Sequence, residues 1–290
     1  MAGRMQAAIF VVISSILSLL IPPLSLFNNA AIGLITLRQG WQQGVLFALL
    51  GSIVIAAVSV LLKQGFGSGL FAGLSNLIPM VVIASVLAMT RSWDKTLQLV
   101  FLLGCGGILL FHLAYPDAAS FWQPLVEKFR PALQQVYGIS DSQIEAYMSQ
   151  ATNWATGTFA ATFSLFAIVS LIIARNWQAR LYNPGGFGKE FRQIRIGKAA
   201  AIAFVGIMAL AVLTGSQLPV ELVMVGMTVF LFQGLSLAHS IVKQLELNSA
   251  WLLGLYALMF LLLIQMIVLL ATFGLIDNFA DFRKLKQLKR

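Results

Sequence analysis

The stretch "GVLFALLGSIVIAAVSVLL", residues 44–62, contains no charged side chain. A run of about 17 to 25 apolar residues is long enough to cross the hydrocarbon core of a bilayer, about 30 Å thick, as an α-helix. The apolar residues are continuous and do not alternate with polar ones, which favours a helix over a strand of a membrane barrel. This stretch therefore predicts a membrane-spanning helix.

Similar stretches recur along the whole chain. Of its 290 residues, 59% are hydrophobic and only 10% are charged, whereas a soluble domain has about 25% charged residues. We expect helices over Gln6–Pro22, Ser25–Leu37, Gly44–Leu62, Gly69–Thr90, Thr96–Tyr115, Thr152–Arg175, Ala199–Thr214, Pro219–Val242 and Ala250–Gly274. The sequence predicts an all-α polytopic transmembrane bundle of about eight or nine segments, a single membrane domain over residues 1–290.

The segment Ser25–Leu37 is too short for a comfortable span at about 1.5 Å per residue. It follows directly on the break at Pro22 and Pro23. It is either a short return helix or part of a re-entrant element, and a re-entrant element is tolerated only where protein covers it.

The basic residues predict an orientation, because cytoplasmic loops carry an excess of Lys and Arg. If the N-terminus is cytoplasmic, that side receives Arg4, Arg38, Arg91, Lys95, Arg175, Arg180, Lys189, Arg192, Arg195, Lys198 and Lys243, and the other side receives Lys63, Lys128 and Arg130. Residues 176–198 therefore form a basic cytoplasmic loop. Because basic loops of this kind meet anionic lipid, the net charge of +9 points to membrane lipids and not to nucleic acid.

The basic tail conflicts with this topology. Arg283, Lys284, Lys286, Lys289 and Arg290 fall on the outer side if all nine segments cross. One of the last three segments must fail to cross if the tail and the basic loop are both cytoplasmic, and the sequence does not show which.

The hydrophilic segment 116–151 is predicted to be an outward-facing amphipathic hairpin. Phe121, Leu125, Phe129 and Leu133 recur at four-residue spacing, which gives a helix one apolar face, interrupted near Pro131. Ser140 and Gln143 form a capping-box pattern for a second short helix. We expect the hairpin to pack on the membrane surface or on the bundle; a lid over an external site is the alternative.

No motif indicates an enzyme or a cofactor. Gly188-Lys189 lacks the first glycine and the Ser or Thr of a phosphate-binding loop, so ATP binding is not expected. Cys105 is the only cysteine, and neither His112 nor His239 has a metal ligand at suitable spacing. No nucleophile, base and acid can be assigned together. Metal sites and catalysis are therefore not expected.

Uncharged polar residues are the candidates inside the spans. Glu221 and Asp277 lie near the ends of their segments, which argues against an ion-coupled carrier built on a buried acid. Asn28, Asn29 and Asn76 lie near proline breaks and Gln233 precedes a glycine, so these four residues are predicted to line a substrate pocket. Hydrogen bonding between helices is the simpler alternative for each.

Glycine and proline mark two further features. Gly65, Gly69 and Gly73 are spaced by four, so they are predicted to line one helical face and to let another helix approach closely. In the basic loop, Asn183, Pro184, Gly185 and Gly186 predict a tight turn, with Phe187 as an apolar anchor. These five residues and Arg192 are predicted to form a docking surface for a cytoplasmic partner. The alternative is a connector held by lipid.

Three motifs carry a resemblance to a family. "NPGGFGKEF" at residues 183–191, "FQGLSLAHSIVKQL" at residues 232–245 and "GLIDNFADFRK" at residues 274–284 resemble the YybS family of bacterial multi-pass membrane proteins, whose function is unknown. That family is grouped by fold with the substrate-binding S-components of energy-coupling-factor (ECF) transporters. The resemblance implies a helical domain of the bacterial inner membrane that binds a small molecule and is energised by a separate ATPase and coupling membrane protein. A non-transporting scaffold of the cell envelope is the alternative.

Overall fold

The computed structural model describes residues 3–137, 140–280 and 282–284, and this part of the chain is helical throughout, without a strand. The predicted all-α class is confirmed. The helices are α1 (Arg4–Leu20), α2 (Ser25–Gln39), α3 (Trp41–Leu61), α4 (Phe66–Thr90), α5 (Trp93–Ala114), α6 (Ala118–Glu127), α7 (Arg130–Tyr137), α8 (Asp141–Asn153), α9 (Ala155–Tyr182), α10 (Gly186–Phe191), α11 (Lys198–Thr214), α12 (Gln217–Gln244), α13 (Ala250–Leu261) and α14 (Leu263–Ala280), with 3₁₀ turns η1 (Pro22–Leu24) and η2 (Phe282–Lys284).

Six helices of the described chain are long and apolar enough to cross a membrane, namely α3, α4, α5, α9, α12 and α14. The apolar helices α1, α11 and α13 are shorter. Length and composition thus support a membrane-type helical bundle.

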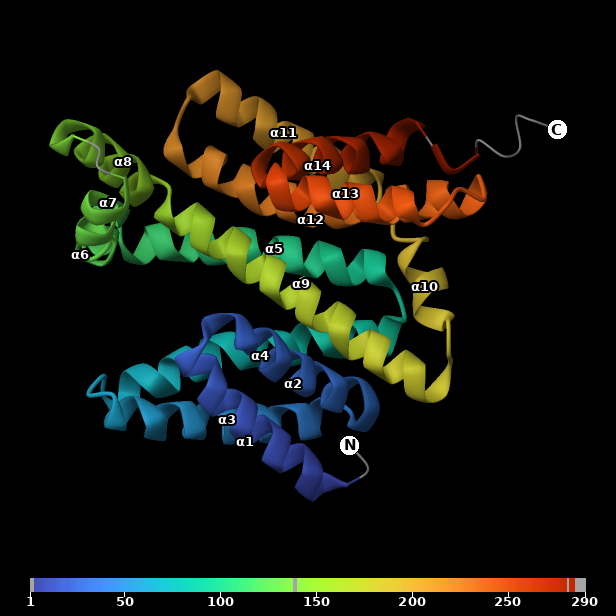
Figure 1. Cartoon of the computed structure of the whole chain (residues 1–290), viewed down its shortest axis with the longest axis horizontal. Coiled ribbons are helices and arrows are strands. Elements are labelled where there is room, and N and C mark those ends of the chain that lie inside the picture. Colours follow the sequence, from blue (N-terminus) through green and yellow to red (C-terminus); the bar gives the residue numbers. More distant parts are fainter. Residues whose placement is uncertain (1–2, 138–139, 281, 285–290) are drawn as a thin grey trace.

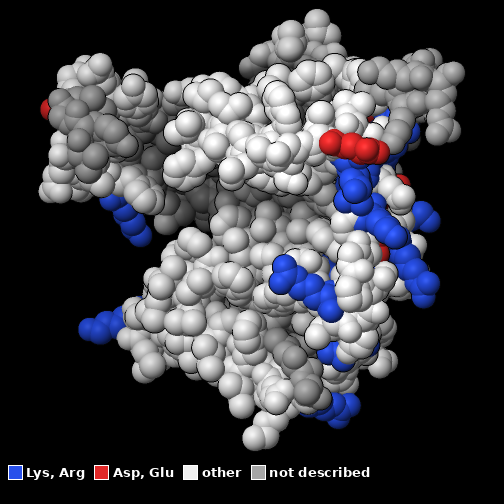
Figure 2. Space-filling model, turned by 45° about the vertical axis from the view of Figure 1, so that its right-hand side comes forward, with Lys and Arg blue, Asp and Glu red and all other residues white. Residues whose placement is uncertain are grey.

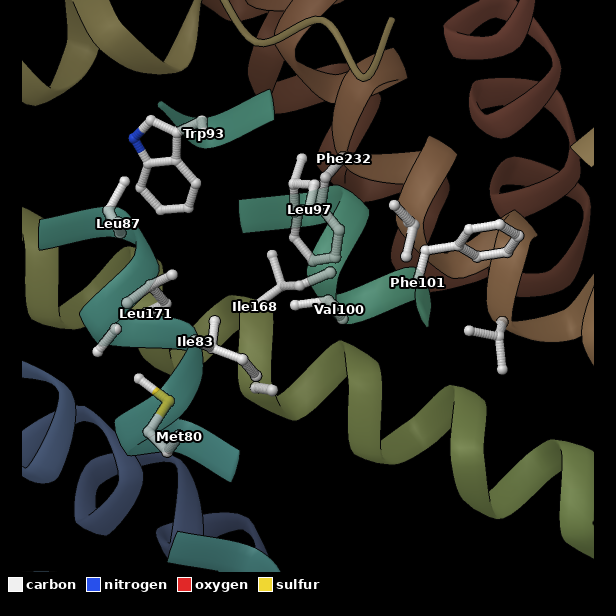
Figure 3. Close-up of a cluster of buried hydrophobic side chains, with 14 of the residues drawn as sticks. Met80, Ile83, Leu87, Trp93, Leu97, Val100, Phe101, Ile168, Leu171 and Phe232 are labelled. Carbon is white, nitrogen blue, oxygen red and sulfur yellow. The ribbon is translucent and has the colours of Figure 1, made fainter. Parts of the chain in front are cut away.

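The helices form two groups joined by α5 and α9 (Figure 1). Helices α1 to α4 lie together on one side and α11 to α14 on the other, while α9 packs against both α2 and α12. Buried apolar side chains fill the region where α4, α5, α9 and α12 meet, including Met80, Leu97, Ile168, Leu171 and Phe232 (Figure 3). The two groups therefore share one hydrophobic core.

The short helix α2 is covered by protein. Every residue from Asn28 to Thr36 is buried, and α2 packs against α1, α3, α4 and α9. Pro22 and Pro23 begin the turn η1 that separates α1 from α2. Figure 1 shows α2 running back to the end of the bundle where α1 begins. This burial satisfies the condition under which so short a helix is tolerated at membrane depth.

Helices α3 and α4 approach each other closely through glycine. A Cβ atom at Gly73 would lie 2.6 Å from the Cα atom of Ser52, and one at Gly69 would lie 2.8 Å from the Cα atom of Ala56. The predicted close approach is confirmed at these two positions. Gly65 has another role, because it precedes α4 with φ +89°, a conformation that only glycine adopts readily.

The prediction of one helix over Ala250–Gly274 is wrong. The chain breaks at Leu262, with φ −126° and ψ 53°, and continues as α14. Helix α13 starts at the end of the bundle that contains the basic loop, and α14 runs back to it (Figure 1). Arg283, just after α14, donates hydrogen bonds to the carbonyl oxygens of Arg192 and Ile194, each 2.6 Å long.

This break bears on the topological conflict of the basic tail. Ala250–Gly274 forms two helices in place of one, so the chain reaches Arg283 at the same end of the bundle as the basic loop. Lys286, Lys289 and Arg290 lie outside the described residues.

The hydrophilic segment 116–151 contains three helices, with α8 packed back on α6 and α7. The interruption predicted near Pro131 is present, since α6 ends at Glu127 and α7 begins at Arg130. The backbone N–H of Ser140 donates to the Gln143 side chain at 3.2 Å, as the capping pattern predicts. The indole N–H of Trp122 donates to Thr156 Oγ1 at 2.8 Å, which ties α6 to α9.

Candidate functional site

The three asparagines predicted to line a pocket lie together among the first four helices. Asn28 and Asn29 are on α2, with 0% and 3% of their surface exposed, and Asn76 is on α4. The amide of Asn29 donates to Asn76 Oδ1 at 3.0 Å. Ser14 and Ser15 of α1 donate to Asn28 Oδ1 at 3.1 and 3.4 Å. We call these five residues the asparagine cluster.

Two polar atoms of the asparagine cluster have no hydrogen-bond partner within the described chain. They are the amide nitrogen Nδ2 of Asn28 and the amide oxygen Oδ1 of Asn29, and both are buried. Leaving a buried polar group unpaired costs about 1–3 kcal/mol. The cluster thus contains one unused donor and one unused acceptor.

The turn between α1 and α2 explains how the asparagine cluster forms. Proline has no backbone N–H and fixes φ, so Pro22 and Pro23 end the first helix. The chain then turns through η1 and returns as α2, which packs against α1. This return brings Ser14 and Ser15 opposite Asn28.

Gln233 belongs to a different polar group, on α12. Its Oε1 accepts from the backbone N–H of Ile196 at 2.9 Å and from Asn278 Nδ2 at 3.3 Å. Its Nε2 donates to Asp277 Oδ2 at 3.3 Å. The structure therefore uses the Gln233 amide to hold α12, α14 and the start of α11 together, and it does not bring Gln233 into the asparagine cluster.

Asp277 is the centre of this second polar group. Its side chain is fully buried, and the Nε–H of Arg283 donates to its Oδ2 at 3.0 Å. Arg195 Nε lies 3.6 Å from the same oxygen. Burial lowers the pKa of Arg283, and the charge of Asp277 opposes that shift. The position of Asp277 near a helix end does not reveal this burial, because its two arginine partners come from other segments.

Glu221 and His112 form a further hydrogen-bonded pair that the sequence does not reveal. Glu221 Oε2 lies 2.6 Å from His112 Nε2, and the exposed fractions of the two side chains are 0% and 20%. Gln217 donates to Glu221 Oε1 at 3.0 Å. A Cβ at Gly157 would lie 2.8 Å from the Cα of Glu221, so glycine lets α9 pack closely here. The sequence places no acid deep in a predicted span, and this argued against an ion-coupled carrier. The buried carboxylate of Glu221 weakens that argument.

The described residues contain no group of three or more His, Cys, Asp or Glu side chains that could hold a metal ion. The histidine and the acid of the buried pair come from α5 and α12. Two such ligands fall short of the four that structural zinc sites use.

The tight turn predicted in the basic loop is confirmed. Helix α9 continues to Tyr182, beyond its expected end at Arg175. Gly185 then adopts φ +79°, and the N–H of Gly186 donates to the carbonyl oxygen of Asn183 at 3.0 Å. A Cβ at Gly186 would lie 2.3 Å from the Asn183 side chain. The backbone conformation of Gly185 favours glycine, and a side chain at Gly186 would displace that of Asn183.

The predicted docking residues differ in exposure. Asn183, Pro184 and Gly185 are exposed, and Gly186 is buried. Phe187 is half-buried, and its ring lies 6.1 Å from that of Trp93. Phe187 therefore anchors the basic loop to the helical bundle. Arg192 is also half-buried, and its carbonyl oxygen accepts from Arg283.

The basic loops gather at one end of the bundle, which we call the basic end. Figure 2 shows most visible Lys and Arg side chains on that side of the molecule. Contacts connect its segments: the guanidinium of Arg38 lies 4.9 Å from the centre of the Tyr182 ring. The N–H of Arg195 donates to Asp94 Oδ1 at 3.0 Å. The loops assigned to one side by their charge therefore share one end of the structure.

Comparisons of the chain with family models, curated proteins and solved structures found no match.

Proposed function

We propose that the chain is a membrane-embedded substrate-binding subunit that binds a small, uncharged polar molecule at the asparagine cluster. The observation that carries this proposal is the pair of unused buried atoms, Asn28 Nδ2 and Asn29 Oδ1. Ligand sites combine an apolar surrounding with a few placed polar groups, and the continuous burial of α2 supplies that surrounding. The ligand is uncharged because the cluster contains only hydroxyl and amide side chains.

In this proposal the chain is a YybS-like multi-pass protein of the bacterial inner membrane, with about eight or nine membrane segments. Residues 116–151 face outward and residues 176–198 face the cytoplasm. The bundle corresponds to the S-component of an ECF transporter and performs no catalysis. Energy comes from a separate ATPase and a coupling membrane protein, in keeping with the lack of a nucleotide motif in the sequence.

The ligand is sought in the purified full chain. Protein extracted from native membranes in mild detergent is denatured, and the small molecules released are identified by mass spectrometry. The Asn28→Leu variant should lose the released molecule, because leucine offers no donor. Gln265→Leu is the matched control, since Gln265 is an exposed amide of α14. Equal release from both variants, or none from the natural chain, would refute the site.

A scaffold of the cell envelope is the second candidate, and the ordering of the basic loop favours it. Arg175 makes a two-bond ion pair with Glu190, and Arg283 holds the carbonyl oxygens of Arg192 and Ile194. Lipid attraction alone does not require such a rigid surface. Asn183, Pro184, Gly185, Gly186, Phe187 and Arg192 would form the docking surface for a cytoplasmic partner.

A double substitution, Gly185→Val with Gly186→Val, tests the docking surface. It should spoil the turn while every charge is kept, because φ +79° is unfavourable for valine. Loss of native partners from a stably inserted variant supports docking. A stable variant that keeps every partner and full cellular activity shows that the loop is only a connector.

A further inference from the structure

A polar pocket opens at the basic end between α2, α4, α9 and α10. It has a volume of about 250 Å³. Leu37, Leu87 and Ala88 contribute the apolar part of the lining, and these residues belong to the last turns of α2 and α4. Arg91, Arg175, Gln178 and Glu190 complete the lining.

Arg91 is the uncompensated charge of this pocket. It caps α4 in the left-handed conformation, with φ 52°, which is uncommon for residues other than glycine. Its guanidinium is exposed and makes no hydrogen bond or ion pair within the described chain. All five of its N–H donors are therefore available to a ligand.

Arg175 is held in place beside it. Its Nε–H donates to Glu190 Oε2 at 3.0 Å, a second bond joins its Nη2–H to Glu190 Oε1, and its Nη1–H donates to Gln178 Oε1 at 2.8 Å. Gln178 is itself anchored to the carbonyl oxygen of Leu37. Arginine has five N–H donors, so two remain free here. Because Glu190 balances the charge of Arg175, the net charge of the pocket is the single positive charge of Arg91.

The pocket lies at the level where membrane helices end. Arg91 directly follows the last residue of α4, and Leu37 lies in the last turn of α2. Trp177, near the end of α9, is half-buried, and tryptophan prefers the interface between lipid and water. A lining that combines apolar and positively charged side chains suits a molecule with an apolar body and an anionic head. Basic pockets between membrane helices bind lipid headgroups, and the planar arginine fork matches phosphate oxygens.

We propose that this pocket binds the phosphate group of an anionic phospholipid, with Arg91 as its main ligand and Arg175 as a prepositioned second donor. The glycerol and the upper acyl carbons cover Leu37, Leu87 and Ala88. The bound lipid thereby bridges α4 and α9 at the basic end.

The test uses the delipidated full chain in a neutral detergent. Phosphatidylglycerol or phosphatidylcholine is titrated in, and bound lipid is counted by native mass spectrometry. The natural chain should retain one phosphatidylglycerol in preference to phosphatidylcholine. Arg91→Gln should weaken that binding about tenfold or more, because charge-assisted hydrogen bonds are lost. Lys95→Gln is the matched control, since it removes one exposed charge from the same end without touching the pocket.

A second variant tests the pocket without changing charge. Ala88→Phe fills the pocket and should weaken phosphatidylglycerol binding while Arg91 is kept. If Arg91→Gln does not fold, Ala88→Phe still decides the question. Equal binding of both lipids, or equal loss in Arg91→Gln and Lys95→Gln, would overturn the proposal, as would full binding by Ala88→Phe.

Inorganic phosphate separates the two possible sources of the anionic group. If it displaces phosphatidylglycerol at millimolar concentration, the pocket recognises the phosphate group alone. If phosphatidylglycerol stays bound, the lipid body is required, as the apolar lining residues predict. The site is distinct from the asparagine cluster, so Asn28→Leu should leave phosphatidylglycerol binding unchanged.

Discussion

At the scale of single residues, Glu221 is a carboxylate buried between helices. Its carboxylate is fully buried and is paired with His112 and Gln217. Removing the carboxylate leaves His112 and Gln217 without their hydrogen-bond partner, and leaving a buried polar group unpaired costs about 1–3 kcal/mol. Glu221→Ala should lower the free energy of unfolding by about that amount in a denaturant titration in detergent.

Glu127→Ala is the control for Glu221→Ala. Glu127 forms an ion pair with Arg130 at the surface, where its side chain is 46% exposed, and exposed ion pairs contribute little. This variant should unfold close to the natural chain. Equal effects of the two substitutions would show that the pair of Glu221 and His112 is not a buried stabilising contact.

The sequence predicts some site residues and misses others for a physical reason. Asn28, Asn29 and Asn76 stand out because uncharged amides inside apolar segments near proline breaks need partners. Glu221 and Asp277 do not stand out, because both lie near helix ends. His112, Arg195 and Gln233 are partners from segments distant in sequence, and spacing along one chain segment carries no information about such contacts.

At the scale of helices, glycine controls how closely α3 and α4 pack. Gly73→Ala should destabilise the protein by about 1–3 kcal/mol, because overpacking forces the helices apart, and its Cβ would meet the Cα of Ser52 at 2.6 Å. Gly107→Ala is the control, since nothing lies within 4 Å of a Cβ there. It should be neutral or stabilising, by up to about 1 kcal/mol from helix propensity. Thermal unfolding in detergent distinguishes the two, and similar midpoints would contradict the close packing.

The contact between Arg283 and the basic loop gives another prediction. Arg283→Ala removes two hydrogen bonds to loop carbonyl oxygens and leaves Asp277 without its closest charged partner. Amide hydrogen exchange in residues 192–197 should become faster. Lys189→Ala is the control, because Lys189 is exposed. Unchanged exchange in Arg283→Ala would show that the loop is ordered without the tail.

The helix plan also shows the limits of sequence patterns. Apolar periodicity and length place the long helices well, and the proline pair marks the turn before α2. The break at Leu262 has no such signal, because residues 257–264 are all apolar and include neither proline nor glycine. Apolar continuity cannot distinguish one crossing helix from two antiparallel ones.

At the scale of the whole molecule, the basic end sets the topology. Cys105 is the only cysteine, so Cys105→Ser gives a clean background for labelling. A cysteine at Lys63 should react with an impermeant reagent in intact cells, and one at Lys189 should react only after permeabilisation, because positive loops stay cytoplasmic. The reverse pattern would overturn the orientation.

In the proposed function, this bundle is the substrate-binding part of a larger transporter. Because such a subunit contains no nucleotide site, its partners and its ligand must travel with it. The most direct measurement is mass spectrometry of the tagged full chain isolated from native membranes, with proteins and small molecules analysed together. The account predicts an ATPase, a coupling membrane protein and one uncharged polar small molecule that Asn28→Leu lacks. An envelope complex with neither an ATPase nor such a molecule would contradict it.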